Sequence, residues 1–327
     1  MPQAEDALPA AGLLAAARAG DGEAFKALVS PHMRALHVHA YRMLGSMDDA
    51  DDAVQDALLS AWRALGTYQG QAPLSHWLYR ITTTSSLKVI RAKSRRPVPA
   101  GEIGHLQPYP DRLLDQLTDA GADPAAVAER RESVALAFIT ALQRLPARQR
   151  AALILRDVLA WNAAETASLL DISVAAVNSA LQRARTTLAG TRPADVAVHP
   201  ELDDHQRQLL DRFTDAWQRC DIDALAALLR EDVTLSMPPE LATITGRTDV
   251  TRFFATVPAG GRLDTIRLVR TAANGHPALA AYLPDKSARC HGYGIMVFTT
   301  TPEGIATITG FPSPDLFRRF GLPPDCE

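Results

Sequence analysis

Hydrophobic spacing divides the chain into a helical part and a mixed part. Before about residue 192, apolar side chains recur every three or four residues, the spacing of helices that bury one face. After about residue 232, short β-rich runs bounded by turn residues follow, for example 295–298 and 305–308. We therefore expect two all-α domains followed by an α+β domain.

Proline and charge mark the joints between these parts. Five prolines fall between 97 and 124, and Pro193 and Pro200 mark a second joint; proline removes a backbone donor and disfavours helix in the residue before it. Residues 101–132 hold 3 basic and 7 acidic residues, whereas 133–192 hold 7 basic and 3 acidic ones. The predicted division is domain 1–97, acidic linker 98–132, domain 133–192, linker 193–203 and domain 204–327.

Composition limits the class of protein. The 34 Lys and Arg against 37 Asp and Glu give a net charge of −3, which excludes a globally basic nucleic-acid coat but not local basic faces. Cys220, Cys290 and Cys326 lie too far apart for a metal motif or a disulfide framework, which indicates a reducing compartment. The N-terminus does not read as a signal peptide, and no apolar run is long enough to span a membrane. We expect a cytoplasmic protein without metal or cofactor.

An acidic helix is predicted over residues 48–65. Apolar residues from Val54 to Leu65 form one stripe, and five aspartates with no base among them crowd the first half. Acids favour a helix start through the macrodipole, so this pattern can be a solvated N-terminus. The other interpretation is a surface that docks on a basic partner.

A basic helix is predicted next. Residues 80–96 carry six basic side chains and no acid, and Lys88, Arg91 and Arg95 share one face, suited to phosphates. Trp77 and Tyr79 precede this face, where they either stack on unpaired bases or belong to the core.

Residues 49–56 and 77–81 closely resemble region 2 of bacterial sigma-70-type factors of the extracytoplasmic-function class. The resemblance implies that the acidic helix grips a coiled coil of the RNA polymerase β′ subunit through Asp49, Asp51, Asp52, Gln55 and Asp56. It also implies that the next loop and helix read and melt the −10 promoter element through Trp77, Arg80, Thr84, Lys88 and Arg91. The family usually has Asn where Thr84 stands, so the −10 preference is expected to differ.

A helix-turn-helix is predicted within 145–188. Asn162 and Glu165 have the spacing of a capping box, Ser173 suits the start of the next helix, and Val177 and Leu181 are expected to face inward. The polar face of the second helix then suits the DNA major groove. The alternative is an ordinary helical hairpin with a polar face.

The same stretch resembles sigma region 4, which implies contacts with the −35 element and with the polymerase β flap. The DNA-binding residues would be Ser173, Asn178, Ser179, Gln182, Arg183 and Arg185. The family commonly has Lys and Arg at the positions of Asn178 and Ala180. We therefore expect weaker and less salt-sensitive −35 binding.

Residues 204–327 predict helix, helix, strand, helix and then strands near 262–271, 278–283, 291–300 and 304–311. This order resembles the SnoaL-like or nuclear transport factor 2-like fold, an extension carried by sigma factors of the SigJ/SigG type. Ketosteroid isomerases of this fold use an aspartate near the end of the first strand. Here Ser236, Met237 and Pro238 stand there, so no catalysis is expected.

Six large side chains of the last domain either line a ligand pocket or simply fill the core: Trp217, Met237, Phe253, Tyr282, Met296 and Phe298. The whole pattern predicts a sigma factor that binds core RNA polymerase and promoter DNA and is regulated in cis by residues 204–327. A small-molecule ligand or an anti-sigma factor is a further expected partner. Two alternatives stay open: a ligand-responsive DNA-binding regulator acting without polymerase, and a cone-shaped enzyme with DNA-targeting modules.

Overall fold

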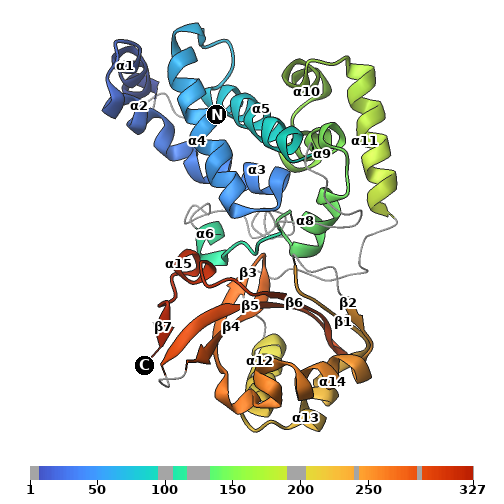
Figure 1. Ribbon diagram of the computed structural model, residues 1–327. Coiled ribbons are helices and arrows are strands. Elements are labelled where there is room, and N and C mark those ends of the chain that lie inside the picture. The colour runs from blue at the N-terminus through green and yellow to red at the C-terminus, as the bar shows by residue number, and fades with distance from the viewer. Residues whose placement is uncertain are drawn as a thin grey trace. The chain divides into compact units, whose positions relative to one another are not determined.

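The chain forms two compact units (Figure 1). The computed structural model describes residues 7–94, 106–115, 133–189, 204–238, 243–285 and 289–326. The helical unit combines residues 1–97 with 142–190, and the sheet unit combines 98–141 with 191–327. The predicted linker 193–203 lies outside the described residues, and of 98–132 only 106–115 are described.

The first half of the helical unit consists of α1 (Ala7–Arg18), α2 (Gly22–Val29), α3 (Met33–Leu44), α4 (Met47–Ala64) and α5 (Leu74–Ser94). The turn between α3 and α4 has a clear local cause. Gly45 ends α3 in the left-handed region with φ 71°, and the Ser46 side chain accepts from the Asp49 N–H at 3.2 Å. Leu36, Met43, Val54 and Leu78 are among the buried side chains that hold α3, α4 and α5 together.

The second half consists of α9 (Ala147–Leu153), a π-helical turn (Ile154–Val158), α10 (Ala163–Leu170) and α11 (Val174–Ala189). The predicted capping box is confirmed: Glu165 N–H donates to Asn162 Oδ1 at 2.9 Å, and Asn162 N–H donates to Glu165 Oε2 at 2.8 Å. Ser173 Oγ accepts from the Ala176 N–H at 3.1 Å and so caps α11. Val177 and Leu181 are buried as predicted.

The sheet unit contains one curved sheet in the order β2-β1-β6-β5-β4-β3, with β7 paired to β5. β1 and β6 are parallel, and the other pairs are antiparallel. The helices α12, α13 and α14 lie against its concave face (Figure 1). The bounds are α12 (Asp204–Gln218), α13 (Ile222–Leu228), β1 (Leu229–Ser236), β2 (Thr243–Thr245), α14 (Arg247–Thr256), β3 (Arg267–Ala273), β4 (His276–Pro284), β5 (Cys290–Thr301), β6 (Gly304–Phe311), α15 (Leu316–Phe320) and β7 (Asp325–Cys326).

Sequence patterns predicted most of these strands but not all of their bounds. The strand expected near 262–271 begins later, because a 3₁₀ turn at Leu263–Thr265 precedes β3. The two- and three-residue strands β7 and β2 have no apolar run long enough to predict them. None of the helices in the described ranges combines the length and apolarity required to cross a bilayer.

Part of the predicted linker packs onto the sheet unit. Tyr109 is fully buried, its N–H donates to Asn274 Oδ1 at 2.7 Å, and its carbonyl accepts from the Asn274 N–H at 2.8 Å. Asn274 Nδ2 also donates to the Val134 carbonyl at 2.6 Å, and Asp111 Oδ1 accepts from the Gly275 N–H at 2.8 Å. One turn between β3 and β4 therefore holds two separate stretches of the segment between the sigma-like regions.

The short helix α6 (Asp111–Asp115) and the helix α8 (Leu136–Gln143) come from these two stretches. Asn274 has φ 57°, a left-handed conformation that Asn tolerates better than most residues. Its side chain satisfies one backbone donor and one backbone acceptor, so a single residue orders both stretches.

Candidate nucleic-acid interface

The acidic helix α4 exposes only part of the residue set predicted for polymerase. Asp49 forms an ion pair with Lys93 of α5, and Asp51 lies 2.9 Å from His37 Nε2. Asp51, Asp52, Gln55 and Asp56 are exposed, whereas Asp49 is half-buried. Leu59, one turn further on, is 49% exposed, although its apolar character would place it in the core. The exposed surface is therefore acidic with an apolar side chain at its end. The apolar spacing along the helix did not predict that Leu59 would be exposed.

The basic helix α5 presents one continuous polar face. Arg80, Thr84, Lys88 and Arg91 are all exposed and recur at spacings of four, four and three residues. The Thr84 hydroxyl donates to the Arg80 carbonyl at 2.9 Å. The Thr84 hydroxyl is therefore bonded within its own helix, whereas the longer Asn side chain that the family usually has at this position would extend away from the helix.

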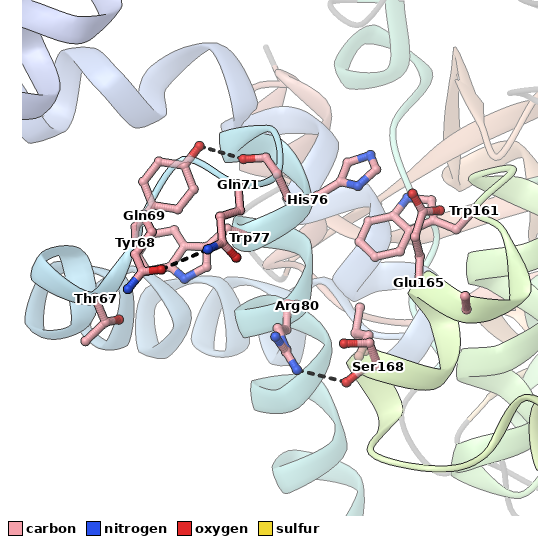
Figure 2. Close-up of a pocket in the computed structure, with 13 residues that line it drawn as sticks. Thr67, Tyr68, Gln69, Gln71, His76, Trp77, Arg80, Trp161, Glu165 and Ser168 are labelled. Atoms are coloured by element: carbon pink, nitrogen blue, oxygen red, sulfur yellow. Dashed lines mark hydrogen bonds between the residues drawn. The ribbon is translucent and has the colours of Figure 1, made fainter.

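A pocket with a volume of about 600 Å³ lies where the loop after α4 meets α5 (Figure 2). Figure 2 shows Tyr68 and Trp77 at one end, with ring centroids 5.2 Å apart, and His76 beside Trp161 at the other. The His76 and Trp161 rings are stacked at 4.3 Å. The lining residues are Thr67, Tyr68, Gln69, Gln71, Ala72, His76, Trp77, Arg80, Trp161, Ala164, Glu165, Ser168 and Leu169.

Helix α10 closes one side of this pocket. Arg80 Nη2 donates to the Ser168 carbonyl at 2.8 Å, and the stacked Trp161 comes from the turn before α10 (Figure 2). The helix-turn-helix therefore contributes to the same pocket as the loop predicted to read the −10 element. Trp161 could not be assigned to it from the sequence, because it is 84 residues from Trp77.

A buried guanidinium joins the two halves of the helical unit. Arg150 on α9 donates to the carbonyls of Gln143 and Leu145, at 2.9 and 3.1 Å, and also to the Met43 carbonyl of α3. Burial lowers the pKa of Arg150 to about 10, so the group stays charged at neutral pH. A charge held in this way needs all of its partners, which makes Arg150 a connection between the halves.

The second helix of the helix-turn-helix, α11, exposes Asn178, Ser179, Gln182 and Arg183. The other two residues predicted to bind DNA have partners within the same region. The Ser173 hydroxyl caps the helix, and Arg185 forms two hydrogen bonds with Asp157, at 2.7 and 3.0 Å. These bonds and the Asp157 charge raise the pKa of Arg185.

The two positions where the resemblance expects a basic residue differ in burial. Asn178 is exposed, but Ala180 is only 5% exposed. An arginine at 180 would have to be accommodated against the core. Asn178 therefore lies where a longer cation would extend directly into solvent, and the expectation that two phosphate contacts are missing stays a prediction.

A histidine is buried between α3 and α5. His39 Nε2 lies 2.8 Å from the Thr83 hydroxyl, and its ring meets Tyr79 edge-on at 5.1 Å. Burial, with a smaller effect of the Arg42 charge, lowers the pKa of His39 to about 3. This imidazole is neutral in the folded protein at physiological pH.

The six residues predicted to line a ligand pocket or fill the core do not share one environment. Trp217 and Phe298 belong to the core on the concave face, and Phe253 and Met296 pack against that core. Tyr282 does not: its hydroxyl donates to the Pro323 carbonyl at 3.0 Å, and its ring meets Phe317 of α15. A pocket that includes Tyr282 with the others is therefore wrong, because successive strand residues face opposite sides of a sheet.

The centre of the concave face is filled by rings. The centroid of the Phe213 ring lies 5.1 Å from that of Phe298, 5.7 Å from that of Trp217 and 6.1 Å from that of Phe254. The Trp217 indole N–H has no hydrogen-bond partner among the described residues. Within the same ranges, no three His, Cys, Asp or Glu side chains are grouped so as to hold a metal ion.

Comparison with known proteins agrees with this architecture. Residues 28–96 match sigma-70 region 2, residues 135–188 match sigma-70 region 4, and residues 210–304 match the SnoaL-like domain. The ECF RNA polymerase sigma factor SigG of Mycobacterium tuberculosis is 38% identical over 326 residues, covering 94% of this chain and 85% of the relative. SigM of the same species is 38% identical over 182 residues, covering 55% of this chain and 82% of SigM.

The fold comparison gives the same result. The crystal structure of the M. tuberculosis extracytoplasmic function sigma factor SigJ matches with a TM-score of 0.61 at 23% identity, covering 89% of this chain and 97% of that chain. A chain that joins sigma regions 2 and 4 is a transcription initiation factor. This chain belongs to the extracytoplasmic-function (ECF) sigma factors, and it carries a C-terminal SnoaL-like domain. ECF sigma factors bind core RNA polymerase and promoter DNA.

Proposed function

We propose that the exposed acidic surface of α4, made of Asp52, Gln55, Asp56 and Leu59, binds the β′ coiled coil of RNA polymerase. The acids would steer a basic partner toward the surface, and Leu59 would supply apolar area to bury at its end. Asp49 supports this surface from behind, because it is half-buried in an ion pair with Lys93. Asp51 is exposed beside the surface and lies close to His37.

The polar face of α5 and the pocket at its start form the proposed −10 site. Tyr68, His76 and Trp77 offer rings on which an unpaired base can stack, and the Gln69 and Gln71 amides offer donors and acceptors for base edges. The face of Arg80, Lys88 and Arg91 would receive the phosphates of the same strand. An arrangement of stacking groups beside cations favours single-stranded DNA over duplex DNA.

The polar face of α11 is the proposed −35 site. Asn178, Ser179, Gln182 and Arg183 project from a helix whose opposite side is buried, which suits insertion into the major groove. Gln and Arg match base edges, and the shorter Ser and Asn suit bases or phosphates. The same region would contact the polymerase β flap.

The SnoaL-like domain would regulate the factor in cis by controlling the segment between regions 2 and 4. The supporting observation is that Asn274 holds Tyr109 and Val134, which come from two stretches of that segment. A linker bound in this way cannot at the same time follow another path. An anti-sigma factor or a small molecule could act on the same contacts.

The function is tested by run-off transcription with purified core polymerase. The double variant Asp52→Arg with Asp56→Arg should lose polymerase binding and promoter-dependent transcripts by at least about tenfold, because two attractive contacts become repulsive. The matched control is Glu23→Arg, which reverses an exposed acid on α2 outside the proposed surface. Equal binding by the double variant and the control would contradict the proposed surface, and no binding by wild type would contradict the function.

A further inference from the structure

The structure brings two cysteines opposite each other at one edge of the sheet unit. Cys290 of β5 is the antiparallel partner of Cys326 of β7, and His291 is the partner of Asp325. Both thiols are free and half-buried. No local sequence pattern predicts this pair, because the two residues are separated by a loop, a strand and a helix.

The register fits a covalent link. The Gly292 N–H donates to the Pro324 carbonyl at 2.8 Å, so Cys290 and Cys326, two residues away, occupy the next hydrogen-bonded position of the ladder. Partners at such positions have Cα atoms about 5.5 Å apart. A disulfide joins Cα atoms that are about 4.4–6.8 Å apart, so the spacing expected at this position lies within the range of a disulfide.

We propose that Cys290 and Cys326 are a reversible redox site, oxidised by hydroperoxides to an intrachain disulfide that fixes β7 and α15 to the sheet. Disulfides in reducing compartments are usually transient and redox-sensing, which fits a half-buried pair that peroxide can reach.

The chemistry balances in two steps. The Cys326 thiolate attacks a peroxide oxygen, the O–O bond breaks, and the hydroxide leaves as water with a proton, which produces a sulfenic acid. Cys290 then gives up its proton and attacks the sulfenic sulfur, the S–O bond breaks, and a second water leaves. Two thiols lose two electrons and two protons, and one hydrogen peroxide becomes two waters. A small dithiol reverses the link by exchange.

The order of attack follows from the surroundings of Cys290. A hydrogen bond with the Cys326 thiol, and then burial, raise the pKa of Cys290. Cys290 therefore holds its proton more firmly than an ordinary cysteine, which suits the second, resolving step. The first step is assigned to Cys326 as the other member of the pair.

The link would act on the residues that clamp the linker. Arg112 of the linker donates to the carbonyls of Arg318 and Arg319 at the end of α15. Phe317 of α15 packs against Gly292, where an added Cβ would lie 2.7 Å from its ring, two residues from Cys290. Packing and hydrogen bonds, including the contacts of His291 with Asp285 and Asp325, hold this segment in the reduced protein. A disulfide would close the segment covalently and stabilise the bound linker.

The test treats the full chain with hydrogen peroxide and maps disulfides by mass spectrometry of unreduced peptides. A link between Cys290 and Cys326 is expected in wild type and in the matched control Cys220→Ser, since Cys220 lies elsewhere, with its Sγ accepting from the Asp264 N–H. It should be absent in Cys290→Ser and Cys326→Ser. The oxidised protein should unfold about 5–10 °C higher than the reduced protein, and dithiothreitol should abolish the difference.

Hydrogen exchange provides the second measurement. Amides of 106–115 and 316–326 should exchange more slowly in oxidised wild type, and no such change is expected in Cys290→Ser. Separate sulfinic acids on the two cysteines, or links between chains, would overturn the redox site. A link without slower exchange would overturn its effect on the linker. Both results are independent of polymerase binding, so they leave the proposed function untouched.

Discussion

The two helices proposed to bind DNA, α5 and α11, differ in how much of their proposed contact surface already contacts other residues of the helical unit. On α5, Arg80 is hydrogen-bonded to the Ser168 carbonyl, and His76 at the helix start is stacked with Trp161. Both partners belong to region 4. On α11, Asn178, Ser179, Gln182 and Arg183 are exposed.

This difference means that the proposed −35 surface is ready to bind, whereas the −10 surface is partly covered by region 4. An exposed hydrogen bond and one ring stack each contribute about 1 kcal/mol. Displacing them therefore costs little compared with the binding of polymerase and DNA. The proposed −10 surface of region 2 would become free to bind DNA when region 4 moves onto the −35 element. Binding to the −35 element would then precede melting at the −10 element.

The largest expected effect follows from removing the connection between the two regions. Arg150→Ala should lower the free energy of unfolding of the helical unit by about 3 kcal/mol, because the Met43, Gln143 and Leu145 carbonyls lose a charged donor. It should also increase hydrogen exchange along the exposed face of α5. The matched control is Arg148→Ala, an exposed arginine on the same helix, with a change within about 0.5 kcal/mol. Urea unfolding measures the free energy of unfolding of both variants. Equal losses of stability in Arg150→Ala and Arg148→Ala would show that Arg150 does not hold the two regions together.

A smaller effect concerns the pH dependence of stability, which should differ between the two regions. The pKa of His39 is about 3 in the folded protein and 6.5 in the unfolded chain, so only the unfolded chain takes up this proton between those values. Stability is therefore complete above pH 6.5 and falls as the pH drops below it, by at most about 1.4 kcal/mol per pH unit. The lowered pKa of His32 acts in the same direction, whereas residues 142–189 contain no histidine.

Urea unfolding at pH 7.5 and 5.0 checks this expectation. Wild type should lose about 2 kcal/mol in region 2 at the lower pH. His39→Gln, which keeps an amide within reach of Thr83, should lose clearly less. If the variant loses as much as wild type, the acid sensitivity has another source.

The smallest effect concerns α11 alone. Asn178→Lys should strengthen binding to a −35 duplex several-fold at low salt and steepen the salt dependence by about 0.9 in slope, the value for one added phosphate contact. Thr186→Lys, an exposed position two turns further along the helix, is the control. Fluorescence anisotropy at several salt concentrations measures the slopes, and identical slopes for the two variants would argue against a phosphate beside position 178.

Local rules predicted the second region well. The Asn162 and Glu165 capping box, the Ser173 cap and the buried Val177 follow from spacings of three or four residues. Such contacts depend on neighbours in sequence, so a single helix specifies them. The order of helices and strands in the SnoaL-like domain could be predicted for the same reason.

Contacts between distant segments could not be predicted in this way. The Asn274 bonds to Tyr109 and Val134 span 165 and 140 residues, and no local pattern distinguishes Asn274 from an ordinary turn residue. The resemblance to sigma region 2 placed Asp49 among the polymerase contacts, and the sequence could not show that Lys93 of α5 pairs with it. The cysteine spacing likewise gave no hint that strand pairing unites two of the three thiols.

The ion pair between Asp49 and Lys93 ties the proposed polymerase helix to the proposed melting helix, which also pack along their length. The side-chain packing between α4 and α5 therefore sets the distance between the proposed polymerase-binding surface and the proposed DNA-binding surface. One helical turn is about 5.4 Å, longer than the roughly 3.4 Å between successive nucleotides of a strand. A slip of α5 along α4 by a single turn would point the reading face at a neighbouring base, so the packing between the two helices should decide where the bubble starts even where every contacting side chain is retained.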